Sequence, residues 1–353
     1  MPRLKQVIAE KIVCFKCNGD LSFSNDFLIC NKCSTKYWVG KNSIAFDDSG
    51  LKTQYGTQFG EGAQNYEQDH SLNEDFSMGV ALTFKKALEK FITLPVDSAL
   101  EIGCGTGVLT RGSNYHRIAR YILATDISKE MLDVAAYKET SDNVMYLVQD
   151  ACKLNIKNNS FDIVFGAAIL HHLSKLKIGL SEVFRVLTPE GVAVFQEPFY
   201  YGNQFVVFLM SIVLENLKLQ RKYSRLNLHV LEKRIDSYSK ILQFRYENRY
   251  TPEKLIAFDD KHLFIQDDLL SWAKEVGFRD VEIISPWQLN PSNNMKVWKE
   301  ITIEVMEALR HESGLEKLRI DYTKVVPLDT FDGLIGSELL GLIPPQGIIV
   351  LQK

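Results

Sequence analysis

The chain has 353 residues, of which 46% are hydrophobic and 24% are charged. This composition can supply a buried core and excludes a disordered chain, and the length fits one large domain or two domains. The formal net charge of −3 excludes a strong overall attraction to nucleic acid or to an anionic membrane.

The apolar segments are short. The N-terminal residues lack the apolar core of a signal peptide, and the longest apolar run, Phe205–Leu214, holds ten residues. A membrane-spanning helix needs about 20 such residues. We therefore expect a cytoplasmic protein without membrane insertion, in a compartment where thiols stay reduced.

Four of the six cysteines form two Cys-x-x-Cys pairs, Cys14 with Cys17 and Cys30 with Cys33. In a reducing compartment such pairs indicate a metal site rather than disulfides. Zn²⁺ takes a tetrahedral set of thiolates, and four sulfurs leave no position for water, so this zinc would be structural. The alternatives are incidental cysteines and a redox dithiol, but the strand–helix–strand pattern typical of the latter is absent nearby.

The residues around these cysteines predict a small β domain. Residues 21–29 predict two short strands around an Asn-Asp turn. Residues 11–47 resemble the short zinc-ribbon domain that is fused to, or partners, many methyltransferases, and Tyr37 and Ile44 match its downstream pattern. We predict a zinc-ribbon domain at 1–46.

A glycine-rich turn follows an apolar strand at 99–102. Gly103, Gly105 and Gly107 occupy alternate positions just after Glu101. Dinucleotide-binding folds use G-x-G-x-x-G to place pyrophosphate at a helix N-terminus. A carboxylate beside the turn is a poor host for pyrophosphate, so the pattern indicates a ligand with an amine or hydroxyls.

Further apolar strands alternate with helical stretches. They are predicted within residues 120–128, 144–154, 161–173 and 191–198, and the third of these stretches runs from a strand into a loop that contains Ala167. This alternation predicts an α/β fold with a parallel, doubly wound sheet. One strand ends in Asp126, about twenty residues past the glycines, where this fold class places the acid that binds ribose hydroxyls. The next strand ends in Asp150.

These elements together resemble the class I S-adenosylmethionine-dependent methyltransferases. The resemblance covers 96–200, 262–284 and 344–353. It implies a Rossmann-like, mostly parallel sheet of seven strands, with the seventh an antiparallel edge strand. A linker or lid at 47–75 would precede a methyltransferase domain at 76–353, which contains two mostly helical insertions at about 199–261 and 285–343.

The resemblance also implies a site for S-adenosylmethionine. The implied residues are Glu101, Gly103, Gly105, Gly107, Asp126, Ile127, Asp150, Ala151 and Ala167. Glu101 and the glycines would surround the methionine end of the cofactor, and Ala167 would lie beneath it. Asp126 would bind the ribose, and Asp150 and Ala151 would contact the adenine. The cofactor is cationic, so acids at the carboxyl ends of strands are favourable whatever the family.

Methyl transfer requires alignment, desolvation and, in some enzymes, a base. The catalytic candidates are His172, after the fourth strand, and Glu197, at the end of the fifth. The alternative is a structural role for His171 and His172, with Glu197 capping the next helix. Glu197 could otherwise hold an acceptor's hydroxyl or amine.

Three functions remain open. The first is methyl transfer to O, N or C of a small molecule, either hydrophobic or phosphorylated. The second is RNA methylation, in which the ribbon and residues 218–254 grip RNA; that segment carries ten basic and four acidic residues with interleaved tyrosines. The third is a non-catalytic scaffold that senses the cofactor. The oligomeric state is not predicted.

Overall fold

The computed structural model describes residues 2–44, 62–69, 73–255, 258, 261–289, 297–315, 317–320 and 346–353. The chain divides into two compact units. The first comprises Met1–Glu197, Leu269–Ile283 and Ile348–Lys353, and the second comprises Pro198–Asp268 and Ile284–Gly347. Most of the predicted linker at 47–75 lies outside the described residues.

The cysteine-rich region forms a helix and a small antiparallel sheet in the order β1-β2-β3. Its elements are α1 (Pro2–Lys11), β1 (Leu21–Ser24), β2 (Phe27–Cys30) and β3 (Lys36–Trp38). Asn25 and Asp26 join β1 to β2 with φ angles of 45° and 64°. Two consecutive residues with positive φ make the tight turn that suits a hairpin. The two predicted strands around this turn are therefore confirmed.

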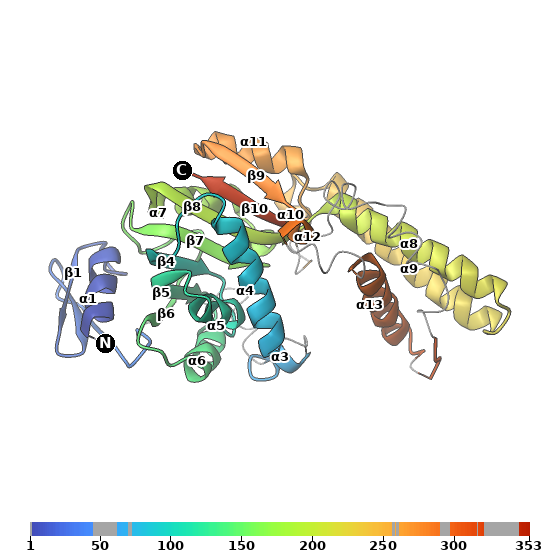
Figure 1. The fold of residues 1–353 in the computed structure, drawn as a ribbon, viewed down its shortest axis with the longest axis horizontal. Coiled ribbons are helices and arrows are strands. Elements are labelled where there is room, and N and C mark those ends of the chain that lie inside the picture. Colours follow the sequence, from blue (N-terminus) through green and yellow to red (C-terminus); the bar gives the residue numbers. More distant parts are fainter. Residues whose placement is uncertain are drawn as a thin grey trace. The chain divides into compact units, whose positions relative to one another are not determined.

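The large sheet has the order β6-β5-β4-β7-β8-β10-β9 (Figure 1). Its strands are β4 (Val96–Ile102), β5 (Ala119–Asp126), β6 (Val144–Val148), β7 (Phe161–Ala167), β8 (Leu187–Pro198), β9 (Asp280–Ile284) and β10 (Gln346–Gln352). Strands β4 to β8 pair in parallel. Every residue of β6 is buried, as expected for a strand covered on both faces. The predicted doubly wound sheet is confirmed.

Helices precede or connect these strands. They are α3 (Tyr66–Asp69), α4 (Glu74–Leu88), α5 (Val108–Tyr115), α6 (Lys129–Lys138), the 3₁₀ turn η1 (Leu170–His172), α7 (Leu176–Val186) and α11 (Gln266–Val276). Side-chain caps fix two of their starts. Asn73 Oδ1 accepts a hydrogen bond from the Phe76 amide at the start of α4, and Ser128 Oγ accepts one from the Met131 amide at the start of α6.

The expectation that the last strand forms an edge is wrong. β10 lies between β8 and β9, and β9 forms that edge. The burial of the two strands gives the physical reason. Residues 347–351 of β10 are all buried, whereas β9 alternates between exposed and partly buried positions before Ile284. A continuously apolar strand such as β10 gains most from burial inside the sheet, whereas a strand with exposed polar positions such as β9 can form the edge.

Residues 42–44, which follow the small sheet, form backbone hydrogen bonds with β6 at the edge of the large sheet. The amide of Tyr146 donates a hydrogen bond to the Asn42 carbonyl at 2.7 Å, and the amide of Ile44 donates to the Tyr146 carbonyl at 3.1 Å. The Asn42 side-chain amide donates to the carbonyls of Ala136 and Glu139 at the end of α6. The cysteine-rich region therefore covers a strand edge that would otherwise be unpaired.

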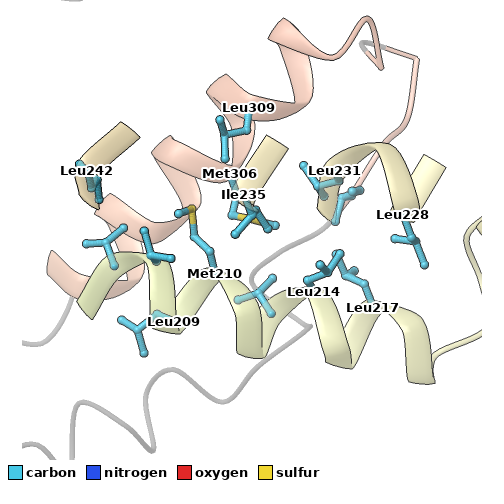
Figure 2. Packing of buried hydrophobic residues seen from close by; sticks show 14 of the residues in the cluster. Leu209, Met210, Leu214, Leu217, Leu228, Leu231, Ile235, Leu242, Met306 and Leu309 are labelled. Carbon is cyan, nitrogen blue, oxygen red and sulfur yellow. The ribbon is translucent and has the colours of Figure 1, made fainter. Parts of the chain in front are cut away.

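The second unit is built on packed helices. They are α8 (Tyr200–Leu219), α9 (Arg225–Glu247), α10 (Pro252–Leu255), α12 (Pro286–Leu289) and α13 (Val297–Glu312). Figure 2 shows Met210 and Leu214 of α8 facing Ile235 of α9 and Met306 of α13 in an apolar cluster. The described parts of both predicted insertions are thus largely helical; residues 290–296, 316 and 321–345 lie outside the described residues.

Candidate functional site

The glycine-rich turn joins β4 to α5, where the strand order reverses between β5 and β7. Ligands of open α/β sheets bind at such a switch point, beyond the carboxyl ends of the strands. Gly103, Gly105 and Gly107 have positive φ angles of 66°, 54° and 80°. A Cβ on Gly103 would lie 2.5 Å from Ile169 Cδ1, whereas one on Gly105 would meet nothing within 4 Å. Gly105 therefore faces open space beside the turn.

Glu101 lies one residue before the end of β4 and is buried. Its Oε2 accepts a hydrogen bond from Thr110 Oγ1 at 2.6 Å, which ties the strand to α5. Burial disfavours the charged form and raises the pKa of Glu101 to about 8, although the Thr110 hydrogen bond acts in the opposite direction. A cationic ligand beside this carboxyl would favour its ionised form.

Asp126 ends β5, next to the turn. Its Oδ2 accepts a hydrogen bond from the Gly105 amide and its Oδ1 accepts one from the Ser128 amide, both at 2.8 Å. Burial raises the pKa of Asp126, against the lowering effect of these amides. The fixed carboxylate keeps lone pairs for a further donor, which is what a ribose hydroxyl needs. Ile127 lies between Asp126 and the residue that caps α6.

Asp150 and Ala151 lie in the turn after β6. The Asp150 carboxylate accepts a hydrogen bond from the Cys152 amide at 2.8 Å, and the neighbouring Gln149 amide donates to the Asp126 carbonyl at 2.9 Å. Asp150 is partly buried. A backbone hydrogen bond therefore joins the turn at Asp150, predicted to contact adenine, to Asp126, predicted to bind ribose.

Ala167 ends β7, and a tight turn follows it. Ala168 has a φ of 54°, and its amide donates to the Gln196 carbonyl at 2.9 Å. The next residue, Ile169, packs its side chain against Gly103. The loop after β7 thus contacts the glycine-rich turn.

Glu197, near the end of β8, is completely buried. Its Oε1 accepts hydrogen bonds from the amides of Ile169 at 3.0 Å and Leu170 at 2.8 Å. Its Oε2 accepts from the His171 amide at 3.3 Å and from His171 Nδ1 at 2.6 Å. Both oxygens therefore hold the η1 turn. His172 ends η1, is partly buried, and its ring lies 4.1 Å from that of His171, centroid to centroid.

The sequence did not reveal this set of four donors to Glu197. The Glu-Pro pair at the end of a buried strand indicates a polar group at the carboxyl end of that strand. Its hydrogen-bond partners, however, belong to a loop that lies 26 to 28 residues earlier in the chain. The hydrogen bonds from Gly105 and Gln149 that join the acidic positions depend in the same way on the folded backbone.

The four N-terminal cysteines meet in one cluster, with their sulfurs all within 4.8 Å of one another. The Sγ atoms of Cys14 and Cys33 are 3.6 Å apart, and those of Cys17 and Cys30 are 3.5 Å apart. A tetrahedral zinc site with Zn–S bonds of about 2.3 Å places its sulfurs about 3.8 Å apart. The amide of Lys32 donates to Cys30 Sγ, which suits a thiolate. The donor set therefore fits a four-thiolate metal shell.

Comparisons with known proteins point to one reaction class. Residues 100–195 match the family model described as "Methyltransferase domain". The malonyl-[acyl-carrier protein] O-methyltransferase of Bacillus cytotoxicus is 26% identical over 153 residues, which cover 43% of this chain and 51% of that protein. The protein of the same name from Buchnera aphidicola is 29% identical over 205 residues, covering 55% of this chain and 78% of that protein. The chain thus spans about half the length of the Bacillus relative.

Among solved structures, a phosphoethanolamine N-methyltransferase of Haemonchus contortus, bound to phosphomonomethylethanolamine and S-adenosylhomocysteine, aligns with a TM-score of 0.47 at 18% identity. The alignment covers 88% of this chain and 61% of that one.

Within the described residues, no helix is both long and apolar enough to cross a membrane. The matched family, the strand order of the large sheet, and the acids and glycines at its carboxyl edge agree with one another. Residues 100–195 thus match a methyltransferase domain, and the sheet around them has the strand order and the edge residues expected of the class I S-adenosylmethionine-dependent methyltransferases.

Proposed function

We propose that this protein transfers a methyl group from S-adenosylmethionine to O, N or C of a small molecule, which can be hydrophobic, phosphorylated or carried as an acyl group. The observation that carries the proposal is the hydrogen bond from the Gly105 amide to the Asp126 carboxylate, beside buried Glu101. Two carboxyl groups around an open glycine turn suit a ligand with a positive charge and hydroxyls. The O-methyltransferase relatives support an acyl-type acceptor.

The bound cofactor would supply a methyl group activated by its cationic sulfur. The chain's own residues would bind and orient it. Glu101 would face the methionine end, and Asp126 would accept hydrogen bonds from the ribose. Asp150 and Ala151 would contact the adenine, and Ala167 would lie beneath the methionine. Such contacts would align the cofactor, and Glu101, which is buried, would hold its end of the ligand away from water.

For Glu197 we propose a positioning role. Its two oxygens already accept four hydrogen bonds from residues 169–171, so it sets the η1 turn rather than transferring a proton to the acceptor. His172, at the end of that turn, remains our candidate for a base.

We also propose that the cysteine cluster holds a structural Zn²⁺. Four thiolates complete its coordination, so no position remains for an acceptor or water. The ion would stabilise the ribbon, which in turn covers the edge of β6 and contacts the loop after it.

The basic segment 218–254 gives less support to RNA methylation. Three of its four tyrosines pack within the helical unit: Tyr246 stacks on Tyr200 with centroids 4.4 Å apart, and Tyr223 and Tyr238 pack against the apolar cluster. The fourth, Tyr250, is 59% exposed, and its hydroxyl donates a hydrogen bond to Asp268. Arg249 pairs with Asp268 at 2.9 Å. Rings engaged in this way are not platforms for bases, which is what binding of single-stranded RNA needs.

A labelled-methyl assay tests the proposal. The protein is incubated with methyl-labelled cofactor and a cell extract that has been separated into small-molecule, protein and RNA fractions. We expect label in the small-molecule fraction, or on a carrier-bound acyl group that mild base releases. Label confined to RNA would support the RNA alternative, and cofactor binding without any transfer would support a scaffold.

A further inference from the structure

The turn between α8 and α9 carries exposed leucines. We call residues 219–226 the hairpin tip. Leu219, the last residue of α8, is 77% exposed, and Leu226, the second residue of α9, is 72% exposed. Among the large hydrophobic side chains that the structure describes, these are the two most exposed aliphatic ones. Figure 1 shows α8 and α9 side by side, with the tip at the end of their hairpin.

Packing of the helical unit does not require either leucine. The apolar cluster takes Leu214 and Leu217 from α8 and Leu228 from α9, all of them buried. Leu219 and Leu226 lie two residues from the nearest of these positions, on the outside of the helices. Figure 2 shows Leu217 and Leu228 at the tip end of the cluster. The exposed leucines therefore form a feature separate from the core.

Positive charge lies between the two leucines. Arg221, Lys222 and Arg225 are exposed, and none of them forms an ion pair within the described part of the chain. The neighbouring Lys218 differs, because it pairs with Glu215 at 2.7 Å and Glu232 at 2.8 Å. The tip itself contains no acidic residue, although the whole chain has a net charge of −3.

We propose that the hairpin tip docks on an anionic lipid surface. The two leucines would enter the boundary of the acyl chains, and the three cations would remain among the anionic headgroups. An RNA partner would need exposed rings to stack on its bases, but Tyr223, the one ring of the tip, is partly buried and packs against the apolar cluster. An acidic protein surface would match the cations and leave the leucines without an apolar partner. The proposal is independent of methyl transfer.

Vesicle sedimentation of the full chain tests this surface. At low salt we expect binding to vesicles with about 30% phosphatidylserine in phosphatidylcholine and little binding to phosphatidylcholine alone. Replacing all three cations (Arg221→Gln, Lys222→Gln and Arg225→Gln) should reduce the partition coefficient roughly a hundredfold, because each contributes about a fivefold effect. Leu219→Ser with Leu226→Ser should reduce it at least about tenfold.

Matched controls change the same kinds of residue elsewhere. Lys233→Gln, Lys254→Gln and Lys274→Gln together remove three exposed charges, and Ile178→Ser with Ile241→Ser removes two exposed apolar side chains. Both control variants should bind vesicles within about threefold of the unchanged protein. All variants are first checked for an unchanged thermal melting curve.

Three results would overturn the proposal. The first is no binding of the unchanged protein to anionic vesicles at low salt. The second is an equal loss of binding in the control and tip variants. The third combines two observations: the protein binds polyuridylate or an acidic polypeptide and loses this binding when the three cations are replaced, and the leucine substitutions leave vesicle binding unchanged.

Discussion

The amide of Val13 donates a hydrogen bond to the carbonyl of Asn155 at 2.9 Å. Val13 directly precedes the first residue of the cysteine cluster, and Asn155 belongs to the loop that follows Asp150. In the same region the Lys157 amide donates to the Lys11 carbonyl, and Lys157 pairs with Asp20 at 2.6 Å. The ribbon and the adenine side of the proposed cofactor site are therefore joined through the backbone.

This connection leads to the first prediction. Cys30→Ser should reduce the zinc content from about one ion per chain towards zero, because a shell that has lost a thiolate binds zinc much more weakly. The ribbon should then unfold at a lower temperature, and the affinity for S-adenosylmethionine should fall as the loop after β6 loses its support. Metal analysis, thermal unfolding and calorimetry measure the three effects.

Cys152→Ser serves as the matched control for metal content, because Cys152 lies outside the cluster. Unchanged zinc content in Cys30→Ser would contradict the four-thiolate shell. Loss of zinc with unchanged cofactor affinity would contradict the proposed support of the loop.

The second prediction concerns pH. Because the pKa of Glu101 is raised to about 8, the free protein holds a proton there at lower pH, and its stability falls as pH rises from about 4.5 to 8. A cationic cofactor favours the charged carboxylate, so binding should release this proton. Cofactor affinity should therefore rise by up to about tenfold per pH unit below pH 8, and then level off.

Calorimetry at several pH values, in buffers of different ionisation enthalpy, measures both the affinity and the proton release. Glu101→Gln should remove the pH dependence. If the unchanged protein showed no pH dependence, or if Glu101→Gln retained it, Glu101 would not be the group beside the cofactor's charge.

The third prediction separates positioning from proton transfer at Glu197. Glu197→Gln replaces two hydrogen-bond acceptors with one and places an amide NH₂ against the donors of residues 169–171. We expect a loss of about 2–4 kcal/mol in the free energy of unfolding and a higher KM for the cofactor, because Ile169 shifts against Gly103. Denaturant unfolding and steady-state kinetics measure these effects.

The exposed Glu190, 85% accessible in its side chain, supplies the control. Glu190→Gln should change the free energy of unfolding by less than about 0.5 kcal/mol. A Glu197→Gln protein of normal stability and normal KM, but with a greatly reduced kcat, would argue for direct proton transfer instead.

Gly103 gives the fourth prediction. Its φ of 66° and the contact with Ile169 leave no room for a Cβ, so Gly103→Ala should lower the free energy of unfolding by about 1–3 kcal/mol and weaken cofactor binding. Gly79→Ala is the control, because a Cβ on Gly79, which lies in α4, would meet nothing within 4 Å. That change should be neutral or stabilising by up to about 1 kcal/mol. Equal effects of the two substitutions in thermal unfolding would contradict the close packing at Gly103.

The sequence predicted the features that local pattern controls. Apolar runs predicted β4 to β8, and the cysteine spacing predicted the four-cysteine cluster, because strands and Cys-x-x-Cys turns are defined by neighbouring residues. The acids at the ends of β4 and β5 follow from the same alternation of strands and helices. Their convergence follows from the parallel order of the sheet.

Other features depend on contacts between distant segments. The position of β10 between β8 and β9 requires the pairing of strands that are separated by the helical insertions. The four donors to Glu197, and the addition of residues 42–44 to the edge of β6, arise only in the folded chain. The basic segment was recognised by composition, but only the structure shows which of its cations form ion pairs, as Lys218 does, and that three exposed ones lie between two exposed leucines at the hairpin tip.

We propose that Asp126 and the glycine-rich turn hold S-adenosylmethionine. Calorimetric titration of the cofactor into the unchanged protein, Asp126→Ala and the control Asp133→Ala, an exposed aspartate on α6, tests it most directly. We predict one site per chain in the first and third proteins and an affinity at least about a hundredfold lower in Asp126→Ala, since hydrogen bonds to a charged acceptor are lost. Equal affinity in all three proteins, with Asp126→Ala still folded, would show that Asp126 does not bind the cofactor.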